Sequence, residues 1–183
     1  HATYGALSAD FGATTYDWAN MSETYNSSST TAQNNAVATL MYHCGVSVDM
    51  NFGLSAAGGS SASTRNTGIA LVNYFAYDPD IQYYDRDNFT YTDWQQIIKT
   101  ELNAARPIIY SGRTDDSGHA FICDGYDSNN LFHINWGWGG QSNGYFELSS
   151  LNSSAQGIRF SIGGYSQSQT IIMGVQKNDG ISN

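Results

Sequence analysis

A histidine that opens one predicted strand, and an amide and an indole that end the next, are the residues best suited to chemistry in this chain. His119 precedes the apolar run 120–126, and Asn135 and Trp136 end the following apolar run. Residues 127–130 between the two runs, Asp-Ser-Asn-Asn, favour a hairpin turn. Such a hairpin brings the imidazole beside the amide and the indole. A histidine held in this way can serve a thiol nucleophile as its base.

This arrangement predicts one role for each residue. We expect His119 to activate a thiol and then protonate a leaving amine, Asn135 to hold the ring through its side-chain carbonyl, and Trp136 to shield that contact from water. The register of the hairpin decides whether His119 shares a face with Asn135 or with Trp136, because a slip of one residue inverts the faces. The Trp-Gly-Trp-Gly-Gly run 136–140 is also compatible with a turn that stacks on sugar rings.

Neither cysteine of the sequence is well placed to be the nucleophile. Cys44 lies on the apolar stripe of a predicted helix, which indicates a buried, inert thiol, and its neighbour His43 points elsewhere on that helix. Cys123 lies on the strand of His119 but four residues away, ~13 Å along an extended strand. The histidines and cysteines, including His133, lack the short paired spacings of zinc sites. We therefore expect no metal, no cofactor and no nucleophile in this chain.

The order of predicted elements indicates an α+β fold. Apolar periodicity predicts helices at 31–44 and about 63–76, and a third from Thr92 up to Pro107, with Gly45 as a left-handed cap on the first. Only strands follow: 108–111, 120–126, 131–136, 145–148 and 171–175. Helices followed by antiparallel strands are typical of α+β proteins. We expect one domain over 1–183, with a helical part at about 1–106 and an antiparallel β part at about 107–183.

Composition excludes several classes of function. The 183 residues include 7 Lys and Arg against 16 Asp and Glu, for a net charge of -9, so the chain has too few cations to bind nucleic acid or an anionic membrane surface. No apolar run approaches the ~18 residues that a membrane span requires. Charged residues make up 13% of the chain and Ser, Thr, Asn and Tyr are abundant. This balance predicts a secreted or cell-surface protein.

Several of these segments resemble one family over nearly the whole chain. Gly118-His119-Ala120-Phe121 and Asn135-Trp136-Gly137-Trp138-Gly139-Gly140 are similar to the catalytic half of streptopain-like cysteine peptidases. Upstream, Tyr16-Asp17-Trp18 and the segment 45–53 resemble that family in the same order. The resemblance implies a papain-like fold, with an N-terminal helical part, a twisted antiparallel sheet or barrel, and protein or peptide substrates bound in a cleft between them. It also implies a secreted bacterial endopeptidase made as a zymogen, with a prosegment that fills the cleft.

The resemblance carries roles to particular residues. It implies that His119 is the catalytic histidine, Asn135 its orienting partner and Trp136 the shielding indole. It further implies that Ser55 and Gly118 line the substrate cleft, and that Trp138 belongs to a rim loop that contacts substrate.

Two departures from the family pattern have consequences. The segment that carries the family's nucleophilic cysteine lies upstream of the Tyr-Asp-Trp stretch, and no such segment occurs here. We therefore expect the native protein to continue before His1, and this chain to be inactive without an N-terminal segment or chain that supplies the thiol. At the position of a family glutamine, eight residues before the histidine, this chain has Ser111, and this departure counts against an oxyanion role for that position. The alternatives are a non-catalytic carbohydrate- or peptide-binding domain and a degenerate peptidase scaffold.

Overall fold

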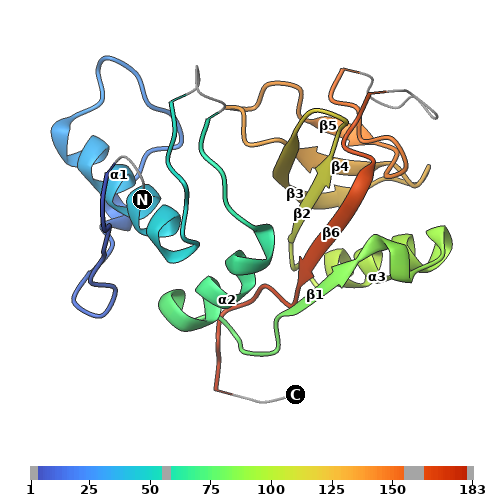
Figure 1. Cartoon of the computed structure of the whole chain (residues 1–183), viewed down its shortest axis with the longest axis horizontal. Helices are drawn as coiled ribbons and strands as arrows, with labels where there is room; N and C mark the ends of the chain where they lie inside the picture. Colours follow the sequence, from blue (N-terminus) through green and yellow to red (C-terminus); the bar gives the residue numbers. More distant parts are fainter. Residues whose placement is uncertain (1–3, 55–58, 155–162, 181–183) are drawn as a thin grey trace. The chain divides into compact units, whose positions relative to one another are not determined.

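Two units divide the chain, the helical His1–Ala76 and the sheet-bearing Tyr77–Asn183 (Figure 1). The structure is a computed structural model and describes residues 4–54, 59–154 and 163–180. Two helices come first along the chain, and every strand of the sheet follows them. The predicted α+β class is confirmed, but the strand Gln82–Asp85 precedes the helix Tyr91–Asn103, so the prediction that only strands follow the third helix missed this strand.

The helical unit is built on α1 (Thr31–Ser47) and α2 (Thr64–Phe75), which pack against each other after the short helix η1 (Trp18–Asn20). A capping box begins α1: the Thr30 hydroxyl accepts from Gln33 N at 3.2 Å, and the Gln33 side chain accepts from Thr30 N at 2.9 Å. These two bonds satisfy amide groups that the first helical turn leaves free. The predicted start of this helix is confirmed.

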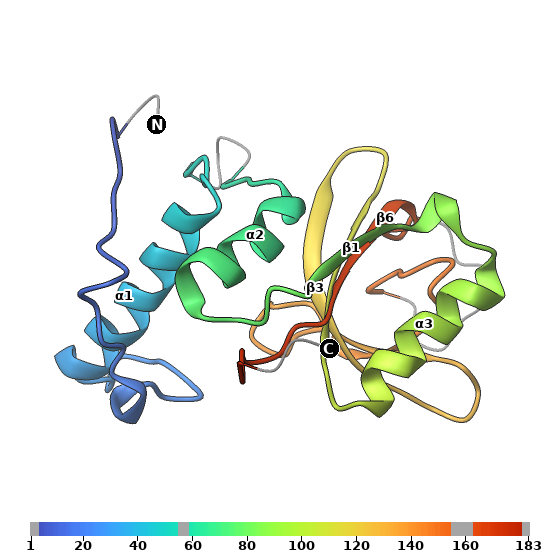
Figure 2. The same ribbon diagram turned by 90° about the horizontal axis from the view of Figure 1, so that it is seen from below.

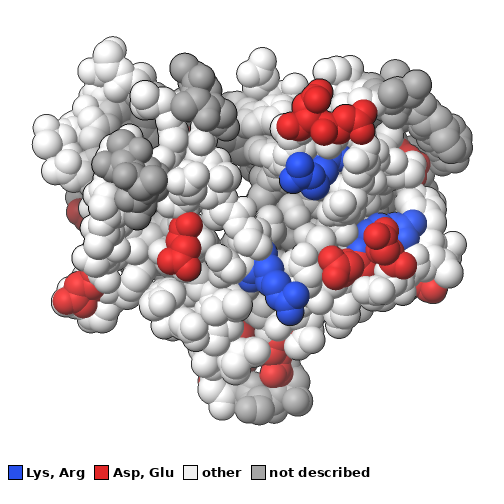
Figure 3. Space-filling model, viewed as in Figure 1, with Lys and Arg blue, Asp and Glu red and all other residues white. Residues whose placement is uncertain are grey.

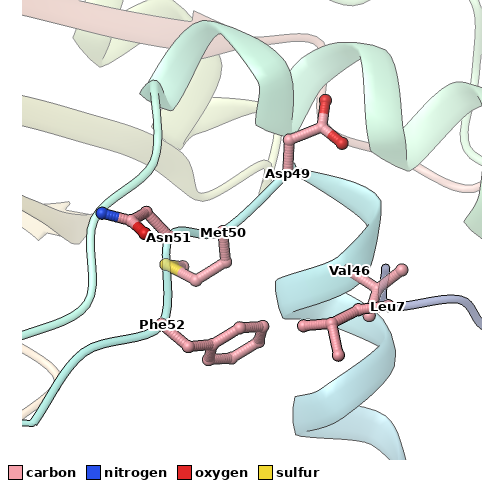
Figure 4. Close-up of a pocket in the computed structure, with 6 residues that line it drawn as sticks. All are labelled: Leu7, Val46, Asp49, Met50, Asn51 and Phe52. Carbon is pink, nitrogen blue, oxygen red and sulfur yellow. The ribbon is translucent and has the colours of Figure 1, made fainter. Parts of the chain in front are cut away.

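Gly45 lies inside α1 and does not cap it, which corrects the sequence prediction. A Cβ atom at Gly45 would lie 2.4 Å from Phe52 Cζ, so glycine is required for the Phe52 ring to pack on the helix. The left-handed residue after the helix is Asp49, with φ 55°. Next to this contact, a pocket of 210 Å³ is lined by Leu7, Val46, Asp49, Met50, Asn51 and Phe52. In Figure 4 the Asp49 carboxylate points away from the Leu7 and Phe52 side chains.

The buried face of α1 differs from the predicted stripe. His43 is buried, whereas Cys44 and Met41 are exposed. The N-terminal aromatic segment determines which face of α1 is buried. Tyr16 Oη lies 3.0 Å from His43 Nδ1, and the Phe11 ring meets the His43 ring edge-on at 5.3 Å. Sequence neighbours on a helix face different directions, so burial of His43 leaves Cys44 outside. The prediction of a buried Cys44 is wrong.

A six-stranded antiparallel sheet forms the second unit (Figures 1 and 2). Its order is β1-β6-β2-β3-β4-β5, with η3 and α3 between the first two strands along the chain. The bounds are β1 Gln82–Asp85, η3 Arg86–Asn88, α3 Tyr91–Asn103, β2 Ile108–Arg113, β3 Gly118–Tyr126, β4 Phe132–Asn135, β5 Gly144–Phe146 and β6 Gln167–Met173.

Helix α3 covers one face of this sheet (Figure 2). Trp94 and Ile98 on its inner side are fully buried, and the Trp94 indole N–H donates to the Tyr110 hydroxyl of β2 at 2.8 Å. Burial of such large apolar side chains stabilises the unit by about 1.5–3 kcal/mol each. Because α3 belongs to the sheet's core, the two units divide before β1 and not at residue 107.

Charged side chains are sparse on the visible surface, where Figure 3 shows small separate groups of both signs on a mostly uncharged face. Within the residues that the structure describes, no three His, Cys, Asp or Glu side chains gather as a metal site would need. No helix in the same part of the chain is long and apolar enough to cross a bilayer.

Glu101 joins the end of α3 to the chain around it. Its carboxylate accepts from Arg106 Nε at 2.8 Å and Nη2 at 2.5 Å, and from Gly174 N at 2.9 Å. The hydrogen bonds from Arg106, aided by the Gly174 amide and by the charge of Arg106, hold the pKa of Glu101 below its usual range, although burial opposes them.

We expect Glu101→Gln to lower the free energy of unfolding near neutral pH by about 1–3 kcal/mol, because it removes charge-assisted hydrogen bonds. A carboxylate with a lowered folded pKa stabilises the fold above its unfolded pKa of about 4.3, and this contribution disappears as pH falls through the folded pKa. Urea unfolding at about pH 7 and about pH 3 should therefore show that the difference in free energy of unfolding between wild type and variant is smaller at the acid pH. Asp87→Asn, at an exposed carboxylate, is the control. A difference that is equally wide at both pH values contradicts the prediction.

Candidate active site

The predicted hairpin is present and joins β3 to β4. The Asp127 carboxylate accepts from Asn129 N and from Leu131 N, each at 2.9 Å, and Asn130 adopts a φ of 63°. These local bonds fix the turn, because Asp and Asn side chains hydrogen-bond the backbone a few residues on and tolerate left-handed conformations. The strands then pair antiparallel, as predicted.

The register resolves the question that the sequence left open. Ile122 pairs with Asn135, so these two residues share a face of the sheet. His119 and Phe121 alternate with Ile122 and lie on the other face, where the Phe121 and Trp136 rings are 4.7 Å apart. His119 therefore lies with Trp136, and Asn135 lies on the opposite face.

The His119 ring is oriented by a main-chain carbonyl. His119 Nε2 lies 2.8 Å from Trp136 O. A carbonyl oxygen only accepts hydrogen bonds, so Nε2 carries the hydrogen and, in the neutral ring, Nδ1 holds the free lone pair. Nδ1 has no hydrogen bond to any residue of the described ranges 4–54, 59–154 and 163–180. This tautomer leaves Nδ1 as the atom that can accept a proton.

Two asparagines hold the peptide that presents this carbonyl. Asn135 Oδ1 accepts from Gly137 N at 3.0 Å, and Asn143 Oδ1 accepts from Trp136 N at 3.0 Å. The expectation of a direct bond from the Asn135 amide to His119 is therefore corrected: Asn135 fixes the turn after Trp136, where Gly137 has a φ of 76°. Sequence reasoning missed Asn143, whose only signal is an amide placed just before β5.

Aromatic rings surround the imidazole. The Trp138 ring stacks on the His119 ring at 4.9 Å and 25°, and the Trp136 ring lies at 6.3 Å and 18°. Trp136 is fully buried, and its indole N–H has no acceptor in the part of the chain that the structure describes. A buried donor without a partner costs about 1–3 kcal/mol.

The remaining predicted site residues are less closely tied to His119. Gly118 pairs with Arg113 at the start of β3, and a Cβ atom there would lie 3.4 Å from Arg113 Nη1. Ser111 pairs with Ala120 and its hydroxyl lies 2.6 Å from Thr170 Oγ1, so it points to the face opposite His119. Ser55 lies outside the described residues.

Comparison with known proteins identifies the family of this chain. The model of the peptidase C10 family matches residues 1–146. Streptopain from Streptococcus pyogenes is 38% identical over 161 residues, and the thiol protease/hemagglutinin PrtT from Porphyromonas gingivalis is 36% identical over 174 residues. The chain belongs to the peptidase C10 family. The aligned regions cover 88% and 95% of this chain, but 40% of streptopain and 20% of PrtT.

Two solved structures from Prevotella intermedia share the fold. Active wild-type interpain A cysteine protease from Prevotella intermedia matches with a TM-score of 0.81 and 39% identity. The match covers 91% of this chain and 67% of the interpain A chain. A prointerpain A fragment has a TM-score of 0.75 and 40% identity, covering 91% and 50%. The α+β, papain-like fold that the sequence motifs implied is confirmed.

The two cysteines of this C10 chain are poor thiolates. Cys123 is fully buried on β3, and burial raises the pKa of its thiol to about 12. Cys44 is exposed on α1, but partial desolvation of its sulfur still raises the pKa of its thiol. The thiolate is the reactive form of cysteine, so neither residue has the lowered pKa of an activated nucleophile.

We expect Asn143→Ala to destabilise the fold by about 1–3 kcal/mol, because it leaves the buried backbone N–H of Trp136 without its acceptor. The same change should loosen the turn that presents the Trp136 carbonyl, and the His119 Nε2–H should then exchange faster with solvent. Amide and imidazole hydrogen exchange followed by NMR measures both effects. Asn129→Ala, in the β3–β4 turn, is the matched control and should leave the His119 hydrogen unchanged. Equal exchange of the His119 Nε2–H in both variants contradicts the role of Asn143 in holding the turn after Trp136.

We expect one thiol of the folded chain to react with Ellman's reagent. Cys44 is exposed and should react slowly, whereas Cys123 is buried with a strongly raised pKa and should react only after unfolding. Cys44→Ser should therefore abolish labelling of the native chain and leave one thiol in denaturant. Rapid labelling of Cys123 in the native state contradicts this assignment.

Proposed function

We propose that the complete protein is a cysteine endopeptidase in which His119 is the general base and acid. The observation that carries the proposal is the bond from His119 Nε2–H to the Trp136 carbonyl, which fixes the ring and leaves Nδ1 free to take a proton. Membership of the peptidase C10 family supports the same assignment.

The chemistry follows from this tautomer. Nδ1 removes the proton of a thiol, and the thiolate attacks the carbonyl carbon of a peptide bond. The ring then passes that proton from Nδ1 to the leaving amine, and a thioester remains on the sulfur. Water attacks the thioester with Nδ1 again as base, and the acid product and free thiol are released. Throughout, the Trp136 carbonyl accepts from Nε2–H and stabilises the charged ring.

We propose that polypeptide outside this sequence supplies the nucleophilic cysteine. Burial of Cys123 and the raised pKa values of both thiols support this. Within the described residues the buried indole N–H of Trp136 has no acceptor, and an acceptor from that other polypeptide would remove this energetic cost, which is a second support. We further propose that protein or peptide substrates bind beside His119, against Trp138 and Gly118.

The complete enzyme is proposed to be a secreted bacterial zymogen. The name of one solved relative, prointerpain A, supports a prosegment that is removed on activation. The low content of charged residues is compatible with an extracellular or cell-surface location.

The test is hydrolysis of a fluorogenic peptide or casein by the complete protein and by its His119→Ala variant. We expect this variant to lose about 10³-fold or more of kcat, because it removes the proton carrier of a catalytic unit, and to keep its unfolding midpoint. His133→Ala is the matched control, since His133 lies on the same hairpin but bonds to Asp124. Cys44→Ser and Cys123→Ala should remain active.

Each other outcome rejects one part of the proposal. Activity that survives His119→Ala removes His119 from the mechanism, and activity lost in Cys44→Ser makes Cys44 the nucleophile. A complete, processed protein that folds but cleaves nothing and reacts with no thiol-directed peptide inhibitor is a scaffold. Binding to a glycan array that disappears in Trp138→Ala would instead favour a carbohydrate-binding domain.

A further inference from the structure

We propose that Tyr165 is a positioning residue for His119 and that the buried carboxamide of Gln169 holds Tyr165 in place. The inference rests on the proposed role of His119 as the base. Tyr165 lies outside the hairpin, just before β6, and none of the sequence motifs contains it.

The Tyr165 ring closes the aromatic surroundings of the imidazole. Its centroid lies 5.5 Å from the His119 ring at an angle of 44°, and 5.5 Å from the Trp136 ring at 42°. Trp138 stacks on the same imidazole at 4.9 Å. Rotation of the imidazole away from the Trp136 carbonyl is therefore limited by rings from two separate segments of the chain, one that follows β4 and one that precedes β6.

The backbone of Tyr165 is fixed against the sheet. Its N–H donates to Leu151 O at 3.1 Å. Its carbonyl lies over β2, where a Cβ atom on Gly112 would be only 2.2 Å from it. Gly112 is the register partner of His119, so glycine at this position lets the Tyr165 backbone approach the strand directly beside the imidazole.

A buried hydrogen-bond network sets the position of this carbonyl. Gln169 is 4% exposed, and its Nε2 donates to Tyr165 O at 3.1 Å and to Leu148 O at 2.7 Å. Its Oε1 accepts from the Tyr110 hydroxyl at 2.9 Å, and that hydroxyl accepts from the Trp94 indole. Every donor has an acceptor, so the carboxamide has one orientation, and fully satisfied buried networks of this kind are rigid. The network connects α3, β2 and β6 to Tyr165.

The consequence is a defined position for the base. The Trp136 carbonyl sets the direction of Nε2, and the Tyr165 and Trp138 rings set the plane of the imidazole, so Nδ1 points in one direction. Catalysis by a base depends on such placement, since misplacement of about 1 Å can cost on the order of 10²-fold in rate.

The experiment compares Tyr165→Ala with Tyr165→Phe, which keeps the ring and removes only the hydroxyl. The position of the base is followed by ¹⁵N and ¹H NMR of the His119 ring in this chain, assigned by its absence in His119→Ala. The kinetics are followed in the complete protein. We expect Tyr165→Ala to shift the His119 ring resonances, to speed exchange of Nε2–H, and to lower kcat by about 10-fold or more with KM within about twofold. Tyr165→Phe should keep most of the wild-type kcat and the wild-type rate of Nε2–H exchange.

Tyr145→Ala is the matched control. The Tyr145 ring lies 5.1 Å from the His133 ring, so its removal should shift the His133 resonances and leave those of His119 unchanged. Tyr165→Leu replaces Tyr165→Ala if the alanine variant does not fold, because leucine fills space without a flat ring.

The proposal would be overturned by a folded Tyr165→Ala or Tyr165→Leu variant in which both the rate of His119 Nε2–H exchange and kcat stay within about twofold of wild type. The NMR readout needs no peptidase activity. A complete protein without activity therefore rejects the proposed function, whereas an unchanged rate of Nε2–H exchange in the folded variants rejects the role of Tyr165.

Discussion

The structure around the candidate site depends on one hydrogen bond, from His119 Nε2–H to the main-chain carbonyl of Trp136. It determines which ring nitrogen is a donor and which is a base. A main-chain acceptor is fixed by the fold itself, unlike a side chain that can change rotamer. The peptide that carries this carbonyl must itself be fixed. The Asn143 and Asn135 carboxamides fix it by accepting from the amides of Trp136 and Gly137.

The rest of the sheet unit serves to keep this peptide and the imidazole in register. The β3–β4 turn is fixed by Asp127, and Trp136 and Phe121 pack as buried neighbours on the face of the sheet that carries His119. Helix α3 stabilises the same core through Trp94. The network from Trp94 through Gln169 then extends this rigidity to the chain before β6, so the surroundings of His119 come from segments that are distant in sequence.

Sequence reasoning predicted the hairpin, the helices and the class of fold, because those features depend on neighbours within a few residues. It was wrong about Cys44, since the buried face of α1 is chosen by the aromatic segment that packs on His43 and not by the hydropathy of the helix alone. Asn143 and Tyr165 could not be found in this way. Asn143 accepts from the backbone amide of Trp136, and the Tyr165 ring packs on the His119 ring. No local sequence pattern links either pair of residues.

The sequence by itself determined which chemical groups are available: an imidazole and an indole on adjacent strands, joined by a short Asp- and Asn-containing turn, and two cysteines unsuited to attack. Only the tertiary structure decided which atom orients the imidazole. The physical reason is that the faces of a strand alternate with every residue, so a register set by the whole sheet placed Trp136 with His119 and turned Asn135 to the other side.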